Sequence, residues 1–188
     1  GLVTAISTEH FSNISMDKKL SNKDLQIMVC TATHTITNNK IAIVNFYQNP
    51  HNNNIDTLIE LDNTLKILEE RKKQFFILGD ANALHSNWTD CKRDNARGTE
   101  LNQLATKHNL LMLNEPHSHT NITHKGNNAT KTVIDFIFSS PESKFEKIQA
   151  YIDHAYTPHS INNDINHNSK SHHFPVLAKI GIQSQHQN

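Results

Sequence analysis

Short apolar runs separated by polar turns dominate this chain and predict more strands than helices. A polar turn around Thr37, Asn38 and Asn39 favours an antiparallel hairpin between two of the predicted strands. The run at 75–78 is short and uniformly apolar, which predicts a strand buried on both faces. The predicted strands cover residues 2–7, 25–32, 40–46, 75–78, 110–113, 132–139, 147–152 and 176–180.

Two segments have the spacing of apolar positions that is typical of an amphipathic helix. The first follows Asn53 or Asn54, either of which can cap it, and ends in a charged run at 69–73. The second covers residues 98–108. Their expected core positions are Leu58, Leu61, Leu65, Leu68, Leu101, Leu104 and Ala105. Strands mixed with only two such helices predict an α/β fold of packed sheets with outer helices, rather than a regular βαβ winding.

The length of 188 residues predicts a single domain. We place this domain at residues 1–182 and a polar tail at 183–188. Hydrophobic residues make up 36% of the chain, and no apolar run approaches the roughly 20 residues of a membrane span. The first residues lack the basic region and cleavage site of a signal peptide, which favours an intracellular protein without a membrane partner.

The formal net charge is zero, with 18 basic and 18 acidic residues. The chain therefore lacks the overall positive charge of a tight, nonspecific nucleic-acid binder, and any contact with DNA must be local. Cys30 and Cys91 lack the close spacing of zinc and redox sites, so we interpret both as reduced thiols. The segments 117–130 and 154–173 are polar loops rich in Asn and His.

Asp80 and Asn82 follow the buried strand at 75–78 with one residue between them. A carboxylate at a strand end can deprotonate a water molecule, and a nearby amide can donate to a phosphate oxygen without repelling it. This pair therefore suits phosphodiester chemistry. The alternative is an ordinary turn in which Asp80 and Asn82 satisfy local backbone groups.

Asp135 interrupts an apolar strand, so its carboxylate is expected to be partly buried and to need a partner. His173 is the candidate, because a carboxylate on one imidazole nitrogen leaves the other nitrogen to face a phosphate. His172 and His173 are adjacent and point to opposite sides of an extended backbone, so only one of them serves the site. The alternative for Asp135 is an edge strand facing solvent.

Four further side chains are candidates for substrate contact. Tyr47 follows the strand at 40–46, so its hydroxyl can reach a phosphate oxygen from the rim of the site, although such a residue is more often a half-buried aromatic. Asn95, Arg97 and Trp88 are candidates for contacting a nucleic-acid backbone or stacking on a base.

These segments together resemble the endonuclease/exonuclease/phosphatase superfamily, and within it the apurinic-endonuclease-like domain of jockey-type non-LTR retrotransposons. The resemblance covers most of the chain. The Gly-Asp-x-Asn element and the Asn-x-Arg-Gly-x-x-Leu segment behind it are its most specific parts. It rests on residues 44–47, 77–83, Trp88, 94–101, 111–114, 133–136 and 171–176.

The resemblance implies a four-layer α/β sandwich that nicks DNA with Mg²⁺ or Mn²⁺ to prime reverse transcription. It also implies DNA as partner, a longer polyprotein with a reverse transcriptase, and a nuclear place of action on host DNA. By the same resemblance, Asp80 activates water, Asn82 and Tyr47 hold the phosphate, and Asp135 orients His173.

Two departures from the family pattern change this expectation. The family's metal-binding Glu, and an Asn before it, belong to strands upstream of the region that matches Gly1, which predicts a truncated domain lacking its first strands. The family's usual Ser-Asp-His is here Ser171, His172 and His173. His172 therefore stands where a carboxylate would lie near the metal, and a neutral imidazole is a poor ligand for Mg²⁺. We therefore expect an impaired copy.

Three alternatives remain open from the sequence. The chain is a degenerate, noncatalytic nucleic-acid-binding module, or it keeps the fold and acts as a phosphatase or phospholipid phosphodiesterase, or its His-rich loops bind a transition metal.

Overall fold

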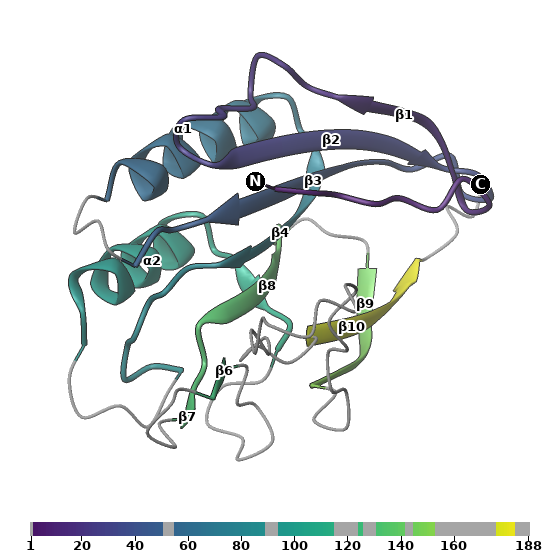
Figure 1. Ribbon diagram of the computed structural model, residues 1–188. Coiled ribbons are helices and arrows are strands. Elements are labelled where there is room, and N and C mark those ends of the chain that lie inside the picture. The colour runs from purple at the N-terminus through teal and green to yellow at the C-terminus, as the bar shows by residue number, and fades with distance from the viewer. Residues whose placement is uncertain are drawn as a thin grey trace, which may run out of the picture.

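The computed structural model describes residues 2–50, 55–88, 94–114, 124–125, 131–141, 145–152 and 176–182. The strands are β1 (Phe11–Met16), β2 (Ile27–His34), β3 (Lys40–Tyr47), β4 (Gln74–Asp80), β5 (Leu111–Met112), β6 (His124–Lys125), β7 (Lys131–Thr132), β8 (Asp135–Ser139), β9 (Phe145–Ile152) and β10 (Val176–Ile182). The helices are α1 (Asp56–Glu70) and α2 (Ala96–Lys107). Figure 1 shows their arrangement.

A six-stranded mixed sheet forms the centre of the molecule, in the order β1-β2-β3-β4-β8-β5. The predicted hairpin is confirmed, because β2 and β3 pair antiparallel. The chain then crosses through α1 to β4, which pairs parallel with β3. The strand of this sheet that comes last in the chain, β8, inserts between β4 and β5 and runs antiparallel to both.

Both helices cover one face of this sheet (Figure 1). Their leucines pack with alternate side chains of the strands, such as Val44, Phe75 and Ile77, in the larger hydrophobic core. The predicted core positions of the helices are buried, and Ala105 is partly buried against them. The expected cap of the first helix differs, since its N-cap is Ile55 and makes no side-chain bond. Asn53 and Asn54 lie outside the described residues.

The opposite face of the sheet packs against β10. Ile41, Phe76 and Ile137 form a second core there, and Val176 and Ala178 of β10 lie against it. Because β10 pairs antiparallel with β9, these two strands form a second sheet. The α/β class, with packed sheets and outer helices, is therefore confirmed. The described residues form three of the four expected layers. These are the helices, the large sheet and the small sheet.

The N-terminal segment differs from the sequence prediction. Residues 2–7 have no regular secondary structure, although they are apolar enough to predict a strand. They lie beside the sheet without a pairing strand among the described residues, and the Asn45 Nδ2 donates to the carbonyl of Val3 at 3.0 Å. The first strand is instead β1, whose side chains are mostly exposed and therefore give no apolar signal.

Two further sequence predictions concern cysteines and membrane segments. Cys30 is a buried free thiol, and burial raises its pKa. Cys91 lies outside the described residues, as do most of the loops at 117–130 and 154–173. Neither helix in the described ranges has the length and apolar character that crossing a membrane requires.

Candidate active site

Tyr47, Asp80 and Asp135 form a row across three neighbouring strands. Tyr47 is the register partner of Asp80 in the parallel pair β3–β4, and Asp80 is the partner of Asp135 in the antiparallel pair β4–β8. Residues directly opposite each other on paired strands point to the same face of a sheet. Phe46 and Phe136, the chain neighbours of this row, belong to the core under the helices. The row therefore points to the opposite face, toward the side of the small sheet.

A cavity of about 370 Å³ opens beside this row. Tyr47 and Asp80 line it together with Asn45, which lies two residues before Tyr47 on the same face of β3. Burial and the negative charge of Asp80 raise the pKa of the Tyr47 hydroxyl. This hydroxyl therefore remains a hydrogen-bond donor at neutral pH. A hollow with a carboxylate that can bind water and a phenol that can donate to an oxygen suits a phosphate ester.

Gly79 allows this close arrangement. A Cβ atom at Gly79 would collide with the backbone oxygen and ring of Phe46 on the neighbouring strand. Because a backbone oxygen in a sheet cannot move aside, the position before Asp80 accepts only glycine. The Gly-Asp part of the sequence motif thus has a packing reason as well as a chemical one.

The chain turns sharply after Asp80. The Asn82 N–H donates to Asp80 Oδ1 at 3.0 Å, and the Ala81 N–H donates to the carbonyl of Ile134 at 2.9 Å. Asn82 has a φ of 46°, in the left-handed region that Asn tolerates better than most residues. Its Nδ2 donates to the carbonyl of Gln48 at 2.9 Å. The turn interpretation of Asp80 and Asn82 is therefore correct, and the same turn holds the Asn82 amide beside the end of β3.

Asn95 and Arg97 stabilise this turn through hydrogen bonds to its backbone. Asn95 Nδ2 and Arg97 Nε both donate to the carbonyl of Asn82, at 3.0 and 2.9 Å. Asn95 also caps α2, since its Oδ1 accepts from the N–H of Gly98 at 2.6 Å and from the N–H of Leu84 at 3.0 Å. The sequence suggested contact with a nucleic-acid backbone for both residues. The structure shows instead that they position Asn82, and a direct contact with DNA stays a prediction.

Trp88 does not lie where the sequence placed it. Its side chain is only 3% exposed and packs edge-on against Phe136, with ring centroids 5.3 Å apart. The ring therefore supports β8 next to Asp135 from the helix side of the sheet. Stacking on a base would require the ring to leave the core, so the expected exposed platform is not present in this structure.

Asp135 is half-buried, as its apolar neighbours predicted. Its position depends on Asn114, which is 1% exposed. Asn114 Nδ2 donates to the carbonyl of Asp135 at 2.9 Å, and Asn114 Oδ1 accepts from the N–H of Ile137 at 2.8 Å. We did not select Asn114 from the sequence, although a polar residue directly after the apolar run at 110–113 was a usable signal. His172 and His173 lie outside the described residues, so the pairing of Asp135 with His173 stays a prediction.

The described residues contain no cluster of three or more side chains arranged to hold a metal ion. The opposed carboxylates of Asp80 and Asp135 nevertheless provide hard oxygen donors at one end of the sheet. Mg²⁺ is commonly held by one or two carboxylates together with water and phosphate oxygens. The donor type at this site therefore fits Mg²⁺ or Mn²⁺.

Solved structures similar to this chain share its fold. The endonuclease domain of TRAS1, a telomere-specific non-LTR retrotransposon, superimposes with a TM-score of 0.57 at 23% identity, over 76% of this chain and 62% of that domain. The APE2 catalytic domain of Xenopus laevis gives 0.63 at 13% identity, over 87% and 60%. A 3'-5' exonuclease of Neisseria meningitidis gives 0.59 at 16% identity, over 90% and 71%. The chain thus spans less than two thirds of the first two structures.

No curated protein sequence matches the chain significantly. The sequence model of one family does match, over residues 41–177, a range that includes Tyr47, Asp80 and Asp135. The matched range covers well over half of the chain. The fold, the position of the row and this match agree, and the chain belongs to the endonuclease-reverse transcriptase family.

Proposed function

We propose that this chain is part of a metal-dependent endonuclease domain that nicks DNA by hydrolysing a phosphodiester bond. The observation that carries the proposal is the row of Tyr47, Asp80 and Asp135 across three paired strands, beside a cavity that Tyr47 and Asp80 line. Membership of the endonuclease-reverse transcriptase family supports it.

We assign a separate role to each side chain of the site. Asp80 accepts the proton of the attacking water, because a carboxylate at the mouth of the cavity is the available base. The Tyr47 hydroxyl and the Asn82 amide donate hydrogen bonds to phosphate oxygens, which places the phosphorus near the water that Asp80 orients. Asp135 orients the imidazole of His173, so that its other nitrogen faces the phosphate.

Asp135 is the described residue that would offer a carboxylate oxygen to Mg²⁺ or Mn²⁺, because Asp80, whose Oδ1 accepts from the N–H of Asn82, is assigned to the water. When bound, the metal supplies a Lewis acid for the scissile phosphate and its leaving oxygen. The two carboxylates and the DNA backbone are all negatively charged and repel one another. A bound divalent cation would reduce this repulsion.

Membership of the endonuclease-reverse transcriptase family supports a proposal for the biological setting. We propose that the nick primes reverse transcription, that the domain works beside a reverse transcriptase in a longer protein, and that it acts on host DNA in the nucleus. His172 replaces the acidic residue expected near the metal, so we propose that this chain by itself nicks slowly.

A plasmid-nicking assay tests the proposal. With Mg²⁺ or Mn²⁺, the unaltered chain should convert supercoiled plasmid into the open circle, and Asp80→Asn should abolish this conversion. Glu70→Gln is the matched control, because Glu70 is an exposed carboxylate at the end of α1 that lines neither the cavity beside Asp80 nor the cavities next to it. Nicking that survives Asp80→Asn contradicts the proposed role of Asp80.

A second candidate is a degenerate module that binds nucleic acid without cutting it. The lack of a three-ligand metal cluster within the described ranges favours it. This candidate predicts no nicking with either metal, together with DNA binding that Asp80→Asn leaves unchanged and that salt weakens.

A further inference from the structure

The turn between β1 and β2, residues 17–26, lies at the same end of the sheet as the candidate active site. Ile27 at the start of β2 pairs with Phe46, and the Tyr47 N–H donates to the carbonyl of Gln26 at 3.1 Å. Tyr47 is in turn the register partner of Asp80. Gln26, the last residue of the turn, therefore lies beside Tyr47, which in turn lies beside Asp80, and the turn borders the site.

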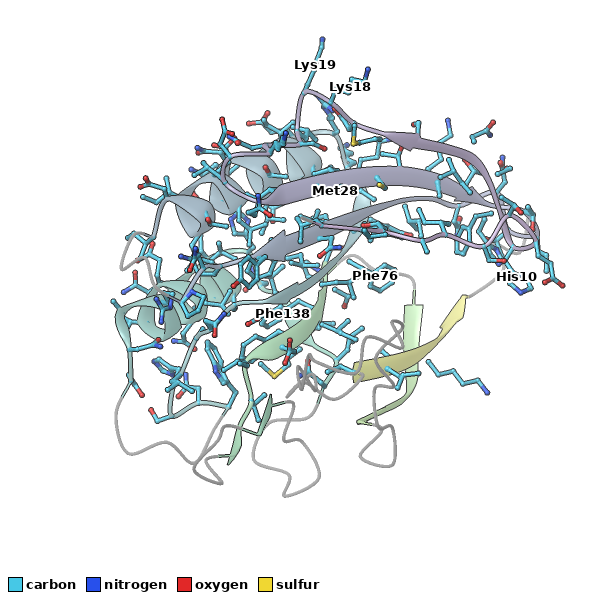
Figure 2. All side chains as sticks on the ribbon, in the orientation of Figure 1. His10, Lys18, Lys19, Met28, Phe76 and Phe138 are labelled. Carbon is cyan, nitrogen blue, oxygen red and sulfur yellow. The ribbon has the colours of Figure 1, made fainter. Side chains whose placement is uncertain are left out.

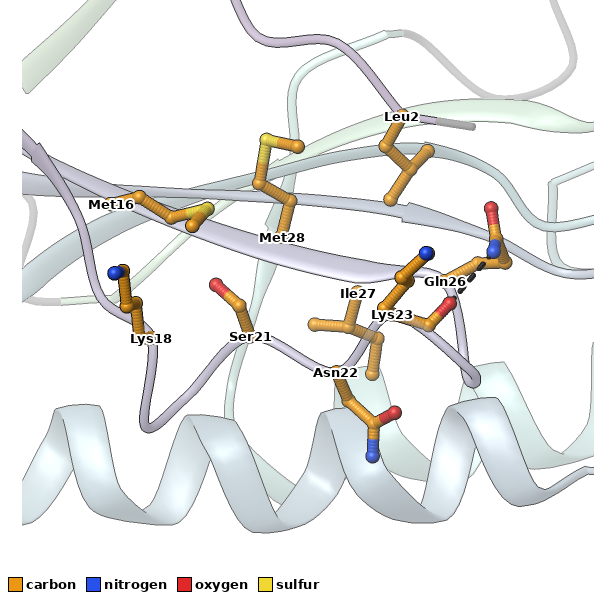
Figure 3. Close-up of a pocket in the computed structure, with 9 residues that line it drawn as sticks. All are labelled: Leu2, Met16, Lys18, Ser21, Asn22, Lys23, Gln26, Ile27 and Met28. Carbon is orange, nitrogen blue, oxygen red and sulfur yellow. Dashed lines mark hydrogen bonds between the residues drawn. The ribbon is translucent and has the colours of Figure 1, made fainter.

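A second cavity, of about 440 Å³, lies beside this turn (Figure 3). Met16 and Met28 form its apolar floor, and Lys18 and Lys23 reach it from the turn. Leu2 and Gln26 line both this cavity and the one that contains Tyr47 and Asp80. The two hollows are thus adjacent, and a chain-like ligand can pass from one to the other.

The turn that carries the lysines is held in a fixed shape. Asp17 Oδ1 accepts from the N–H groups of Lys19 and Leu20, at 3.0 and 3.3 Å. Asn22 Oδ1 does the same for the next turn of chain, accepting from the N–H groups of Asp24 and Leu25 at 3.1 Å. The backbone that positions Lys18 and Lys23 is therefore ordered before a ligand arrives, which lowers the entropic cost of binding.

The charges near this cavity favour an anion. Lys18 and Lys23 are exposed, and neither forms an ion pair in the described part of the chain. The nearby Asp17 is engaged by Arg71 at 3.4 Å. A separate cavity of about 280 Å³, also lined by Gln26 and Tyr47, carries the carboxylates of Asp24 and Asp56 instead. A polyanion leaving the active site is attracted to the lysine side and repelled from the carboxylate side.

We propose that the cavity lined by Lys18, Lys23, Met16 and Met28 is a subsite for the DNA strand that flanks the scissile phosphate. This inference rests on the proposed endonuclease function and adds the path of the substrate. The two ammonium groups pair with successive backbone phosphates, and the carbon atoms of the sugars pack on the methionine floor. The neutral net charge of the chain agrees with a local contact of this kind.

Fluorescence anisotropy of a labelled DNA duplex, measured in EDTA over a series of NaCl concentrations, tests the subsite. The double variant Lys18→Ala/Lys23→Ala removes two phosphate contacts. The slope of log Kobs against log salt should therefore become shallower by about 1.8. The affinity at low salt should fall as well, and the far-ultraviolet circular dichroism should stay unchanged because both side chains are exposed.

The matched control is the double variant Lys19→Ala/Lys40→Ala, which removes the same charge from exposed positions that do not line the cavity. Figure 2 shows Lys18 and Lys19 on the same turn, so the control also tests position within that turn. An equal change of slope in both double variants, or no change in either, overturns the subsite.

Nicking of plasmid separates this inference from the proposed function. With both correct, Lys18→Ala/Lys23→Ala raises KM and leaves kcat near that of the unaltered chain, while Asp80→Asn abolishes kcat and keeps DNA binding. If the chain binds DNA through Lys18 and Lys23 but never nicks, the subsite stands and the nuclease function fails. If the chain nicks and the lysine variant keeps its KM and salt slope, the subsite fails alone.

Discussion

Arg97 donates through Nε to the carbonyl oxygen of Asn82 at 2.9 Å, which ties the first turn of α2 to the turn behind Asp80. Its terminal nitrogen also donates to the carbonyl of Pro50, at 3.3 Å. One planar guanidinium thus joins the segment after β4 to the segment after β3. This link holds Asn82, and with it the turn that follows Asp80, in position.

Replacing Arg97 with Lys should lower kcat for nicking by about 10- to 100-fold, because an ammonium cannot reproduce two directed contacts and small displacements of catalytic groups are costly. KM should change little. Steady-state nicking rates measure the split, and Arg71→Lys, a surface ion-pair residue, is the control. A raised KM with an unchanged kcat would show instead that Arg97 contacts the DNA.

Gly98→Ala should destabilise the fold by about 1–3 kcal/mol. The added methyl group would collide with the backbone of Leu84, which packs against the first turn of α2 and cannot move aside. Thermal unfolding followed by circular dichroism gives the change in Tm. Ala96→Ser, at an exposed position of the same helix turn, should leave the Tm nearly unchanged, and equal losses in the two variants would argue against the collision.

Asp62 links α1 to the end of α2 and should make the free energy of unfolding depend on pH. Burial alone would raise the pKa of Asp62, but hydrogen bonds from Lys107, Lys66 and His108 hold it well below its ordinary value of 3.8. A carboxyl with a lowered folded pKa stabilises the fold above its unfolded pKa and loses this contribution as pH falls through the folded value. Asp62→Asn should therefore cost about 1–2 kcal/mol at neutral pH.

The measurement for Asp62 is urea unfolding at two pH values. The difference in unfolding free energy between the unaltered chain and Asp62→Asn should shrink when the pH is lowered from neutrality to below 3.8. His108, whose two ring nitrogens lie 2.8 Å from Asp62 and Glu69, shares this network. A difference that stays constant over this range would mean that the charge of Asp62 is not what stabilises the helix pair.

Tyr47→Phe should reduce nicking by about 10- to 100-fold with little change in stability, since it removes one donor to the phosphate and keeps the ring. The raised pKa of Tyr47 adds a pH signature, because the hydroxyl keeps its proton beyond the ordinary value of 10.0. The rate of the unaltered chain should therefore not fall through loss of this proton until the pH exceeds 10.0. An identical rate for Tyr47→Phe would remove Tyr47 from the site.

The sequence predicted the elements whose apolar pattern is strong. The helix leucines, the hairpin and the buried strand at 75–78 are confirmed, because burial requires this periodicity. It missed β1, whose exposed side chains leave no pattern, and it placed a strand at 2–7, where the structure shows no strand pairing. Apolar character alone does not make a strand, since a strand also needs a neighbour to receive its hydrogen bonds.

The sequence predicted which residues come together at the strand ends, but it did not predict the side-chain contacts of the residues that surround them. Asp80, Asn82, Tyr47 and Asp135 do lie at one end of the sheet, because polar residues at the ends of paired strands meet there. The surrounding residues depend on side-chain direction, which a sequence pattern does not contain. Arg97 and Asn95 turn back onto a carbonyl, and Trp88 turns into the core.

The insertion of β8 between β4 and β5 determines when the site can exist. Tyr47 and Asp80 belong to one β3-α1-β4 unit, whereas Asp135 arrives more than fifty positions later in the chain. During synthesis on a ribosome, a nascent polypeptide that has folded only as far as β4 holds one carboxylate without its opposite. The pairing of Asp80 with Asp135 is therefore complete only after β8 has been synthesised and has joined the sheet, so a translation product that stops before β8 would lack the assembled site.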